Sequence, residues 1–316
     1  LSHSAYVLEK RASTQYVTHA FLEPQSALAK VDRSGRLTLW SCTQIPHYLQ
    51  RTLSLVLGIP DKDVRVIVPA VGGAFGGKGE VASNELCAAL LARKSGRPVK
   101  VTYERDEVFY NNKGRHPMDM RIKIGVDERG LLQAIDFSTL MDGGAYLGWG
   151  VVVMFYCAAM LHLPYKVPNV RFYGKRVFTN KPTCGAMRGL GGVQPRIAVE
   201  TALDEIALNM GMSPHELRWK NAVESGHTTA SNMFVRHSEY KKCLDDVVKR
   251  TGYLERRGTL PFGRGIGLAG GHYSSGTAYT LYLSYKPHSD ALIRVDPEAG
   301  VSVYCDAGES GQRWDT

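Results

Sequence analysis

The feature that most constrains the fold is a strand-like segment that leads through a glycine-rich loop into a helix. The loop reads VGGAFGGKGE at residues 71–80 and contains five glycines in ten residues. A short β-branched segment at 64–69 precedes it, and apolar residues recur with helical spacing from 80 to 93. Glycine permits positive φ and lets the backbone approach a ligand closely. N–H groups near a helix start favour an anion there.

Two further glycine loops also follow strand-like segments. The second, CGAMRGLGGVQ at 184–194, lies between a strand-like segment at 170–179 and a helix expected over 195–210. The third, DAGESGQ at 306–312, follows the last strand-like segment. Three such loops indicate a ligand rich in phosphate and carbonyl oxygens. Tight turning alone is the alternative explanation for each loop taken singly.

A nucleotide phosphate loop is the first alternative. Gly72, four further residues, then Gly77 and Lys78 satisfy most of the G-x-x-x-x-G-K-[ST] pattern. The last position is Gly79, which has no hydroxyl to hold a magnesium ion. The sequence therefore disfavours a nucleotide-hydrolysing enzyme.

The remaining pattern predicts an α+β fold of mixed sheets with packed helices. The polar segment 255–261 predicts a boundary between a domain at 1–254 and the start of a second one at 255–316. Helical spacing appears at 45–57, and a further helix starts near Pro214 after an N-capping Ser213. Strand-like segments lie at 35–43, 99–103, 121–126, 131–140, 265–270, 291–295 and 301–304.

Composition excludes several classes of protein. The 316-residue chain has a net charge of +9, but the charge is scattered, so nucleic-acid binding is not expected. The longest apolar run, 151–163, is too short to span a membrane and predicts a buried element. Six cysteines without close spacing predict reduced, mostly buried thiols and a cytoplasmic protein. Because it begins at Leu1 and stops at Thr316, the chain is expected to be part of a longer polypeptide.

The motifs resemble a known family when they are taken together and in order. The chain is similar to the molybdopterin-binding catalytic subunit of the molybdenum hydroxylases, which include xanthine dehydrogenase, aldehyde oxidoreductase and 4-hydroxybenzoyl-CoA reductase. The likeness covers nearly the whole chain and implies the cofactor-binding fold of the xanthine dehydrogenase type. The motifs are GGAFGGK (72–78), AMRGLGG (186–192), LRWKN (217–221) and GESGQ (308–312), supported by HAFLEP (19–24), SCTQ (41–44), ERDEVF (104–109), GRHP (114–117), DGGAYLG (142–148) and VPNV (167–170).

The resemblance implies a molybdenum atom held through the dithiolene of a pterin, with no direct protein ligand. An aldehyde, N-heterocyclic or aromatic substrate would be hydroxylated with oxygen from water, or reductively dehydroxylated. Iron–sulfur clusters and FAD are expected on partner chains or on segments outside this sequence. The implied partners are an iron–sulfur subunit and an FAD subunit in a higher-order oligomer.

The resemblance also carries roles to individual residues. Gln44 matches a glutamine near an apical molybdenum oxygen, and Arg188 matches an arginine that orients substrate. An ordinary strand-end amide and a surface arginine are their alternatives. The residues expected to contact the cofactor are Gln44, Gly73, Ala74, Phe75, Gly76, Arg188, Gly189, Gly311 and Gln312.

Four residues are expected to be mainly structural. Arg218 is expected in an ion pair or at the rim of the cofactor site. His19, His116 and His162 are expected to be hydrogen-bonded structural histidines, because their spacing is not that of metal ligands.

Three departures from the family pattern bear on the substrate. Gly79 stands where xanthine-type members have a glutamate, which disfavours a purine. Gly189 stands where carbon monoxide dehydrogenases have a cysteine, which disfavours a copper-bridged site. The segment GHYSSG (271–276) is similar to that of members acting on aromatic substrates, so Tyr273 is a candidate for the substrate pocket, with a core tyrosine as the alternative.

The resemblance places the catalytic base outside this sequence. In the family it is a glutamate in a Gly-Glu motif near the C-terminal end of the full subunit, and this chain ends before that region. The isolated chain is therefore expected to be inactive. The alternative is a non-catalytic or split pterin-binding subunit that relies on another chain for the glutamate.

Overall fold

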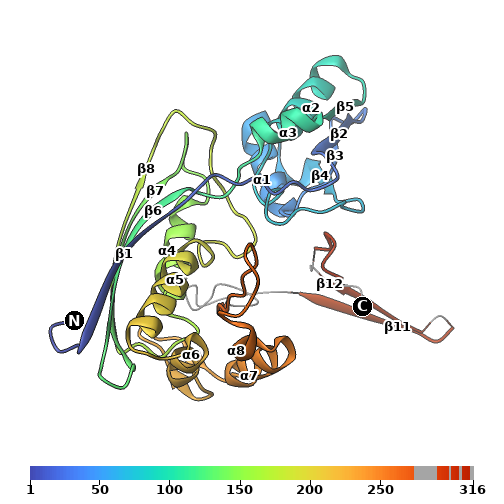
Figure 1. Ribbon diagram of the computed structural model, residues 1–316. Coiled ribbons are helices and arrows are strands. Elements are labelled where there is room, and N and C mark those ends of the chain that lie inside the picture. Colours follow the sequence, from blue (N-terminus) through green and yellow to red (C-terminus); the bar gives the residue numbers. More distant parts are fainter. Residues whose placement is uncertain (274–289, 299, 306–307, 314–316) are drawn as a thin grey trace.

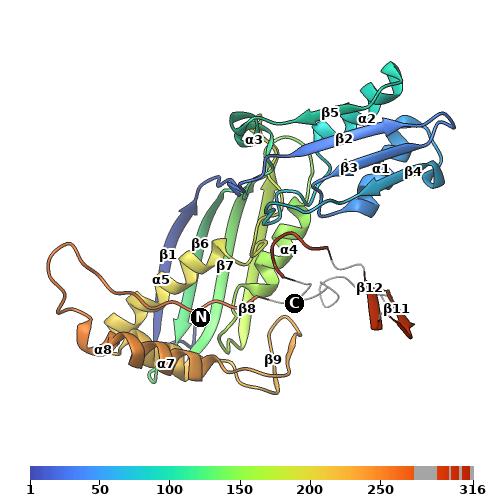
Figure 2. The same ribbon diagram turned by 90° about the vertical axis from the view of Figure 1, so that its right-hand side faces the viewer.

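The computed structural model describes residues 1–273, 290–298, 300–305 and 308–313, and these residues form an α+β fold with mixed sheets. Figure 1 shows two units, each a sheet with helices packed against it, and Figure 2 shows the smaller unit beyond one end of the larger sheet. The expected fold class is confirmed.

The smaller unit is a four-stranded sheet in the order β4-β3-β2-β5, and only β3 and β4 pair in parallel. Leu49 and Leu53 of the first helix, together with Ala88 and Ala92 of the second, are fully buried against it. Its elements are β2 (Ser26–Val31), β3 (Leu37–Ser41), α1 (Pro46–Leu57), the short 3₁₀ turn η1 (Asp61–Asp63), β4 (Val64–Ile67), α2 (Ser83–Ser95) and β5 (Val99–Thr102).

The larger unit is a sheet in the order β1-β6-β7-β8, with α4 and α5 on one face (Figure 1). The alternation MDMRIKIG in β6 explains this one-sided packing: Met120 and Ile122 are buried under the helices, while Arg121 points to the other face. The elements are β1 (Tyr6–Thr14), β6 (Met118–Val126), β7 (Leu132–Asp142), α4 (Gly150–Met160), β8 (Asn169–Val177) and α5 (Gln194–Asn209).

The other elements link or flank the two units. The chain leaves the smaller unit through α3; α6 packs against α5, and α7 packs against α6 (Figure 1). Two short hairpins, β9-β10 and β11-β12, form separate sheets. These elements are α3 (Arg105–Asn111), α6 (Pro214–Asn221), β9 (His227–Thr228), β10 (Phe234–Val235), α7 (Tyr240–Thr251), α8 (Tyr253–Arg256), β11 (Ala291–Asp296) and β12 (Gly300–Cys305).

Two sequence expectations differ from the structure. Residues 265–270 do not form a strand. The backbone N–H of Gly270 donates to the Glu200 carboxylate at 2.9 Å instead of to a neighbouring strand. The helix expected from residue 80 begins at Ser83, because residues 80–82 still belong to the glycine loop. The boundary expected after residue 254 stays a prediction.

The apolar run at 151–163 forms the core helix α4, as expected. All six cysteines are free, but only Cys42, Cys157 and Cys184 are buried, so the expectation of mostly buried thiols holds for half of them. Within the described part of the chain, no helix is both long and apolar enough to cross a membrane.

Candidate functional site

The first glycine loop is a tightly wound backbone segment between β4 and α2. Gly73, Phe75 and Gly76 have φ values of 93°, 52° and 95°. The N–H of Gly77 donates to the Ala74 carbonyl at 2.8 Å, which closes one turn of the loop. Positive φ is costly for an aromatic residue, so the half-exposed Phe75 is held by its surroundings. Ala74 is fully buried beneath the loop.

The second glycine loop packs backbone to backbone against the first. The N–H of Arg188 donates to the Phe75 carbonyl at 2.9 Å. A Cβ at Gly76 would lie 2.9 Å from the Ala186 carbonyl oxygen, so only glycine fits this approach. Arg115 donates to the Arg188 carbonyl at 2.6 Å and holds the second loop from the other side.

A cavity of about 720 Å³ lies where the two loops meet the turn at 308–312. Except for the buried Ala74, every residue expected at the cofactor or substrate site lines it, although the segments are far apart in sequence. The lining consists of Gln44, Gly73, Phe75, Gly76, Ala186, Met187, Arg188, Gly189, Leu190, Tyr273, Ser310, Gly311 and Gln312.

Gln44 reaches the cavity from the segment that follows β3. Its N–H donates to the Lys78 carbonyl at 2.9 Å, which ties it to the end of the first loop. A Cβ at Gly79 would lie 3.0 Å from the Gly76 carbonyl oxygen and 3.7 Å from Gln44 Oε1. A side chain at position 79 would therefore press on the Gly76 carbonyl and touch the Gln44 amide.

Arg188 and Tyr273 supply the distinctive side chains of the cavity. Arg188 is exposed, and its guanidinium has no ion pair or hydrogen bond within the described ranges. The Tyr273 ring stacks on Tyr156, with ring centres 5.6 Å apart, and its hydroxyl lies 3.5 Å from the Leu190 carbonyl. Residues 274–276 of the GHYSSG segment lie outside the described residues.

The turn at 308–312 presents backbone to the cavity. Gly311 has φ 107°. The Gln312 amide oxygen accepts from the N–H and hydroxyl of Ser310 at 2.8 and 2.9 Å, and its NH₂ group donates to the Gly308 carbonyl. The Gln312 side chain therefore shapes its own turn. The first two residues of the DAGESGQ motif, 306 and 307, lie outside the described residues.

The sequence analysis did not select four cavity residues. Ala186, Met187 and Leu190 flank Arg188 in AMRGLGG, and Ser310 lies in GESGQ. Their presence inside the two motifs was the available signal.

Of the four residues expected to be mainly structural, two have the polar partners that were expected. Arg218 is fully buried and bonded to Glu200 at 2.9 Å and to Asp204 at 2.7 Å, so the expected ion pair is confirmed. His19 is hydrogen-bonded to the Ala186 carbonyl and to Asn112.

His116 and His162 are buried, but they lack the good hydrogen bonds that were expected for them. The ring nitrogens of both are buried. Those of His162 make no hydrogen bond within the described part of the chain, and those of His116 have at most a weak contact with the Gly185 backbone. Burial, together with the cations Arg176 and Arg196 respectively, lowers the pKa of each to about 4.

The cavity lining carries groups that can bind the polar atoms of a pterin cofactor. The described residues contain no cluster of three or more His, Cys, Asp or Glu side chains that could hold a metal. The lining instead combines close backbone from three loops with the amide of Gln44 and the guanidinium of Arg188. Backbone and amide groups can bind the polar atoms of a pterin, and a guanidinium can bind an oxyanion.

Comparisons with known proteins agree with this geometry. A sequence model of the family described as "Molybdopterin cofactor-binding domain" matches residues 1–222. The nicotinate dehydrogenase large molybdopterin subunit of Eubacterium barkeri is 35% identical over 256 residues, which are 79% of this chain and 60% of that protein. A putative xanthine dehydrogenase molybdenum-binding subunit of Escherichia coli (strain K12) is 31% identical over 98% of this chain and 42% of its own length.

The solved structures give the same picture. Quinoline 2-oxidoreductase from Pseudomonas putida 86 superposes with a TM-score of 0.86 at 28% identity, over 98% of this chain and 42% of that chain. The chain therefore spans about half the length of the relatives it matches. The resemblance seen in the sequence motifs is confirmed, and the chain belongs to the molybdopterin cofactor-binding domain family.

Proposed function

We propose that the cavity between the two glycine loops binds the molybdopterin-type molybdenum cofactor of an oxidoreductase. The observation that carries the proposal is the single cavity of about 720 Å³ lined by Gln44, both glycine loops and the 308–312 turn. When bound, the cofactor supplies the redox centre for hydroxylating an aldehyde, N-heterocyclic or aromatic substrate with oxygen from water, or for the reverse reduction.

The chain's own residues bind the cofactor and orient the substrate. Phe75 and Gly76 place backbone against the cofactor, and Gln44 offers an amide donor beside it. Preorganised donors of this kind stabilise charge that develops on oxygen during a reaction. The Arg188 guanidinium orients a substrate carbonyl or carboxylate. Tyr273 forms an aromatic side of the substrate pocket.

The proposed activity also requires a catalytic base and a route for electrons. We propose that the catalytic glutamate, the iron–sulfur clusters and FAD are supplied by other segments or partner subunits. The relatives' names, "large molybdopterin subunit" and "molybdenum-binding subunit", support an assembly of several subunits. Six free thiols support a cytoplasmic location.

Molybdenum and pterin analysis of the complete natural protein tests the proposal. We expect about one molybdenum and one pterin per chain, and a loss of most of both in Gly76→Ala. The added Cβ would meet the Ala186 carbonyl at 2.9 Å and strain a φ of 95°. Gly58→Ala is the matched control, because Gly58 also has positive φ, but it lies at the end of α1 with open space around it. A wild-type protein without either component, or equal contents in both variants, would contradict the proposal.

A further inference from the structure

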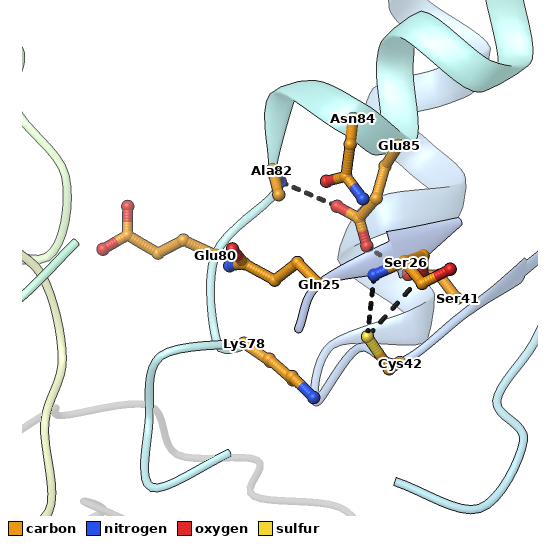
Figure 3. Close-up of a pocket in the computed structure, with 9 residues that line it drawn as sticks. All are labelled: Gln25, Ser26, Ser41, Cys42, Lys78, Glu80, Ala82, Asn84 and Glu85. Atoms are coloured by element: carbon orange, nitrogen blue, oxygen red, sulfur yellow. Dashed lines mark hydrogen bonds between the residues drawn. The ribbon is translucent and has the colours of Figure 1, made fainter. Parts of the chain in front are cut away.

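The lysine of the first glycine loop faces away from the cavity. The Lys78 side chain is only 1% exposed, and its Nζ lies 2.6 Å from Glu23 Oε2. The same ammonium lies 4.8 Å from the centre of the Phe21 ring. Figure 3 shows Lys78 on the side of the loop where Gln25 and Cys42 lie, and these residues line a small polar pocket. Lys78 is therefore bound within the protein and does not line the cofactor cavity.

One carboxylate holds both ends of the loop. Glu23 Oε2 accepts the Gly72 N–H at 2.7 Å as well as the Lys78 ammonium. The Glu23 N–H in turn donates to the Gly72 carbonyl at 3.2 Å. A Cβ at Gly72 would lie 2.6 Å from the Glu23 Cβ, so the approach requires glycine. Glu23 thus fixes the separation between residue 72 and residue 78.

The backbone at the end of the loop is hydrogen-bonded to a residue that lines the cavity. The Lys78 carbonyl accepts the N–H of Gln44, and the Gly77 carbonyl accepts from Gln25 Nε2 at 3.4 Å. Phe75 lies between the two ends that Glu23 joins. A displacement of Lys78 would therefore move Gln44 and Phe75, although neither Glu23 nor Lys78 lines the cavity.

We propose that Glu23 and Lys78 are a positioning pair that sets the shape of residues 72–78 and thereby the placement of Gln44 and Phe75 against the cofactor. The inference deepens the proposed function and rests on it for the identity of the ligand. The ion pair acts through the loop backbone and touches neither cofactor nor substrate.

The energetics of buried ion pairs allow an effect on the loop conformation to be distinguished from an effect on the stability of the fold. Removing one partner leaves the other as an uncompensated buried charge, which destabilises the fold. Replacing both partners by apolar residues of similar size is often neutral for stability. An apolar pair, however, cannot accept the Gly72 N–H, so the two ends of the loop are no longer joined.

The test compares Glu23→Gln, the double variant Glu23→Leu with Lys78→Met, and a control in the complete natural protein. The control, Glu224→Gln, removes a carboxylate from an exposed ion pair with Lys166 and Lys241. Three quantities are measured: amide hydrogen exchange at residues 44 and 72–79, the rate of pterin release, and the unfolding temperature. The first readout does not depend on activity or on the presence of the cofactor.

We expect Glu23→Gln to lower the unfolding temperature and to speed both loop exchange and pterin release about tenfold, a change that corresponds to about 1.4 kcal/mol. The double variant should recover most of the unfolding temperature while loop exchange and pterin release stay fast. The control should match wild type in all three quantities.

Three outcomes overturn the proposal. In the first, the double variant regains wild-type loop exchange and pterin release, so that only charge compensation matters. In the second, Glu23→Gln leaves both quantities unchanged. In the third, the double variant does not fold, so that the pair is needed by the fold as a whole. Absence of pterin from the wild-type protein would instead reject the proposed function, while loop exchange would still test the pair.

Discussion

At the residue scale, the cavity offers one cationic side chain whose charge is not compensated by the described residues. The Arg188 backbone is fixed from two sides, by the Phe75 carbonyl and by Arg115. Its guanidinium has no partner within the described ranges and lines the cavity. A fixed backbone with an uncommitted planar cation is suited to bind a carbonyl or carboxylate with two parallel hydrogen bonds.

Arg188→Met therefore tests substrate orientation. Hydrogen bonds to a charged group contribute roughly 1.5–3 kcal/mol, so kcat/KM should fall about 10- to 100-fold. Molybdenum and pterin contents should match those of wild type, because the backbone contacts remain. Steady-state kinetics of the complete natural protein with an aldehyde and an N-heterocyclic carboxylate measure the effect. Arg11→Met, at an exposed position of β1, is the control. An unchanged kcat/KM for every substrate would rule out this role.

The members of the site could be predicted, but the direction of Lys78 could not. The order of the motifs pointed to Gln44, Phe75 and Arg188, and the structure brings all three to one cavity. The phosphate-loop pattern, which Gly79 disfavours, would place the lysine against a ligand. Its actual partner, Glu23, lies 55 residues away in sequence, and local spacing does not encode such a contact.

At the element scale, the packing of α6 against α5 depends on one buried cation. Arg218 donates to the carboxylates of Glu200 and Asp204 and to the Glu200 and Pro214 carbonyls. Glu200 also accepts from the Tyr165 hydroxyl at 2.9 Å. These bonds join two helices and the segment that carries Gly270 and leads to Tyr273.

Arg218→Met should lower the free energy of unfolding by about 3–5 kcal/mol, because it leaves Glu200 buried without its main cation. Urea-induced unfolding followed by circular dichroism measures the loss. Arg129→Met is the comparison, since Arg129 pairs with Asp127 at an exposed turn, where such pairs contribute about 0–1 kcal/mol. Similar losses in both variants would show that the Arg218 network contributes little.

Elements with a clear period were predictable, and those held by side chains were not. The spacing at 45–57 predicts α1, which begins at Pro46 and ends before Gly58. Residues 265–270 have strand-like composition, but the carboxylate that binds Gly270 belongs to α5, 70 residues earlier. A sequence pattern shows the spacing of apolar residues in a segment. It does not show which distant group the backbone of that segment hydrogen-bonds to.

At the scale of the whole molecule, buried neutral histidines make stability depend on pH. In the folded state the pKa of His116 and His162 is about 4, below the ordinary value of 6.5. Between these values the unfolded chain binds protons that the folded chain does not. The free energy of unfolding therefore decreases as pH falls from about 6.5 toward 4, by roughly 3 kcal/mol for each histidine.

The expected result is a lower urea midpoint at pH 5 than at pH 7.5, and His162→Leu should reduce that difference. His19 and His272, whose pKa values burial also lowers, should keep part of it. The comparison isolates His162, because other titrating groups are present in both proteins. One of these is Glu85, whose pKa is raised by burial and whose effect on stability has the opposite sign. An identical pH dependence in wild type and variant would show that the pKa of His162 is the same in the folded and unfolded states.

The lining of the cavity also bears on how the protein matures in the cell. Its residues run from Gln44 to Gln312, so the pocket cannot be complete before residue 312 has left the ribosome. Both glycine loops can meet once α5 has formed, and the 308–312 turn arrives last. A nascent chain shorter than 312 residues would therefore offer the proposed cofactor only part of its site.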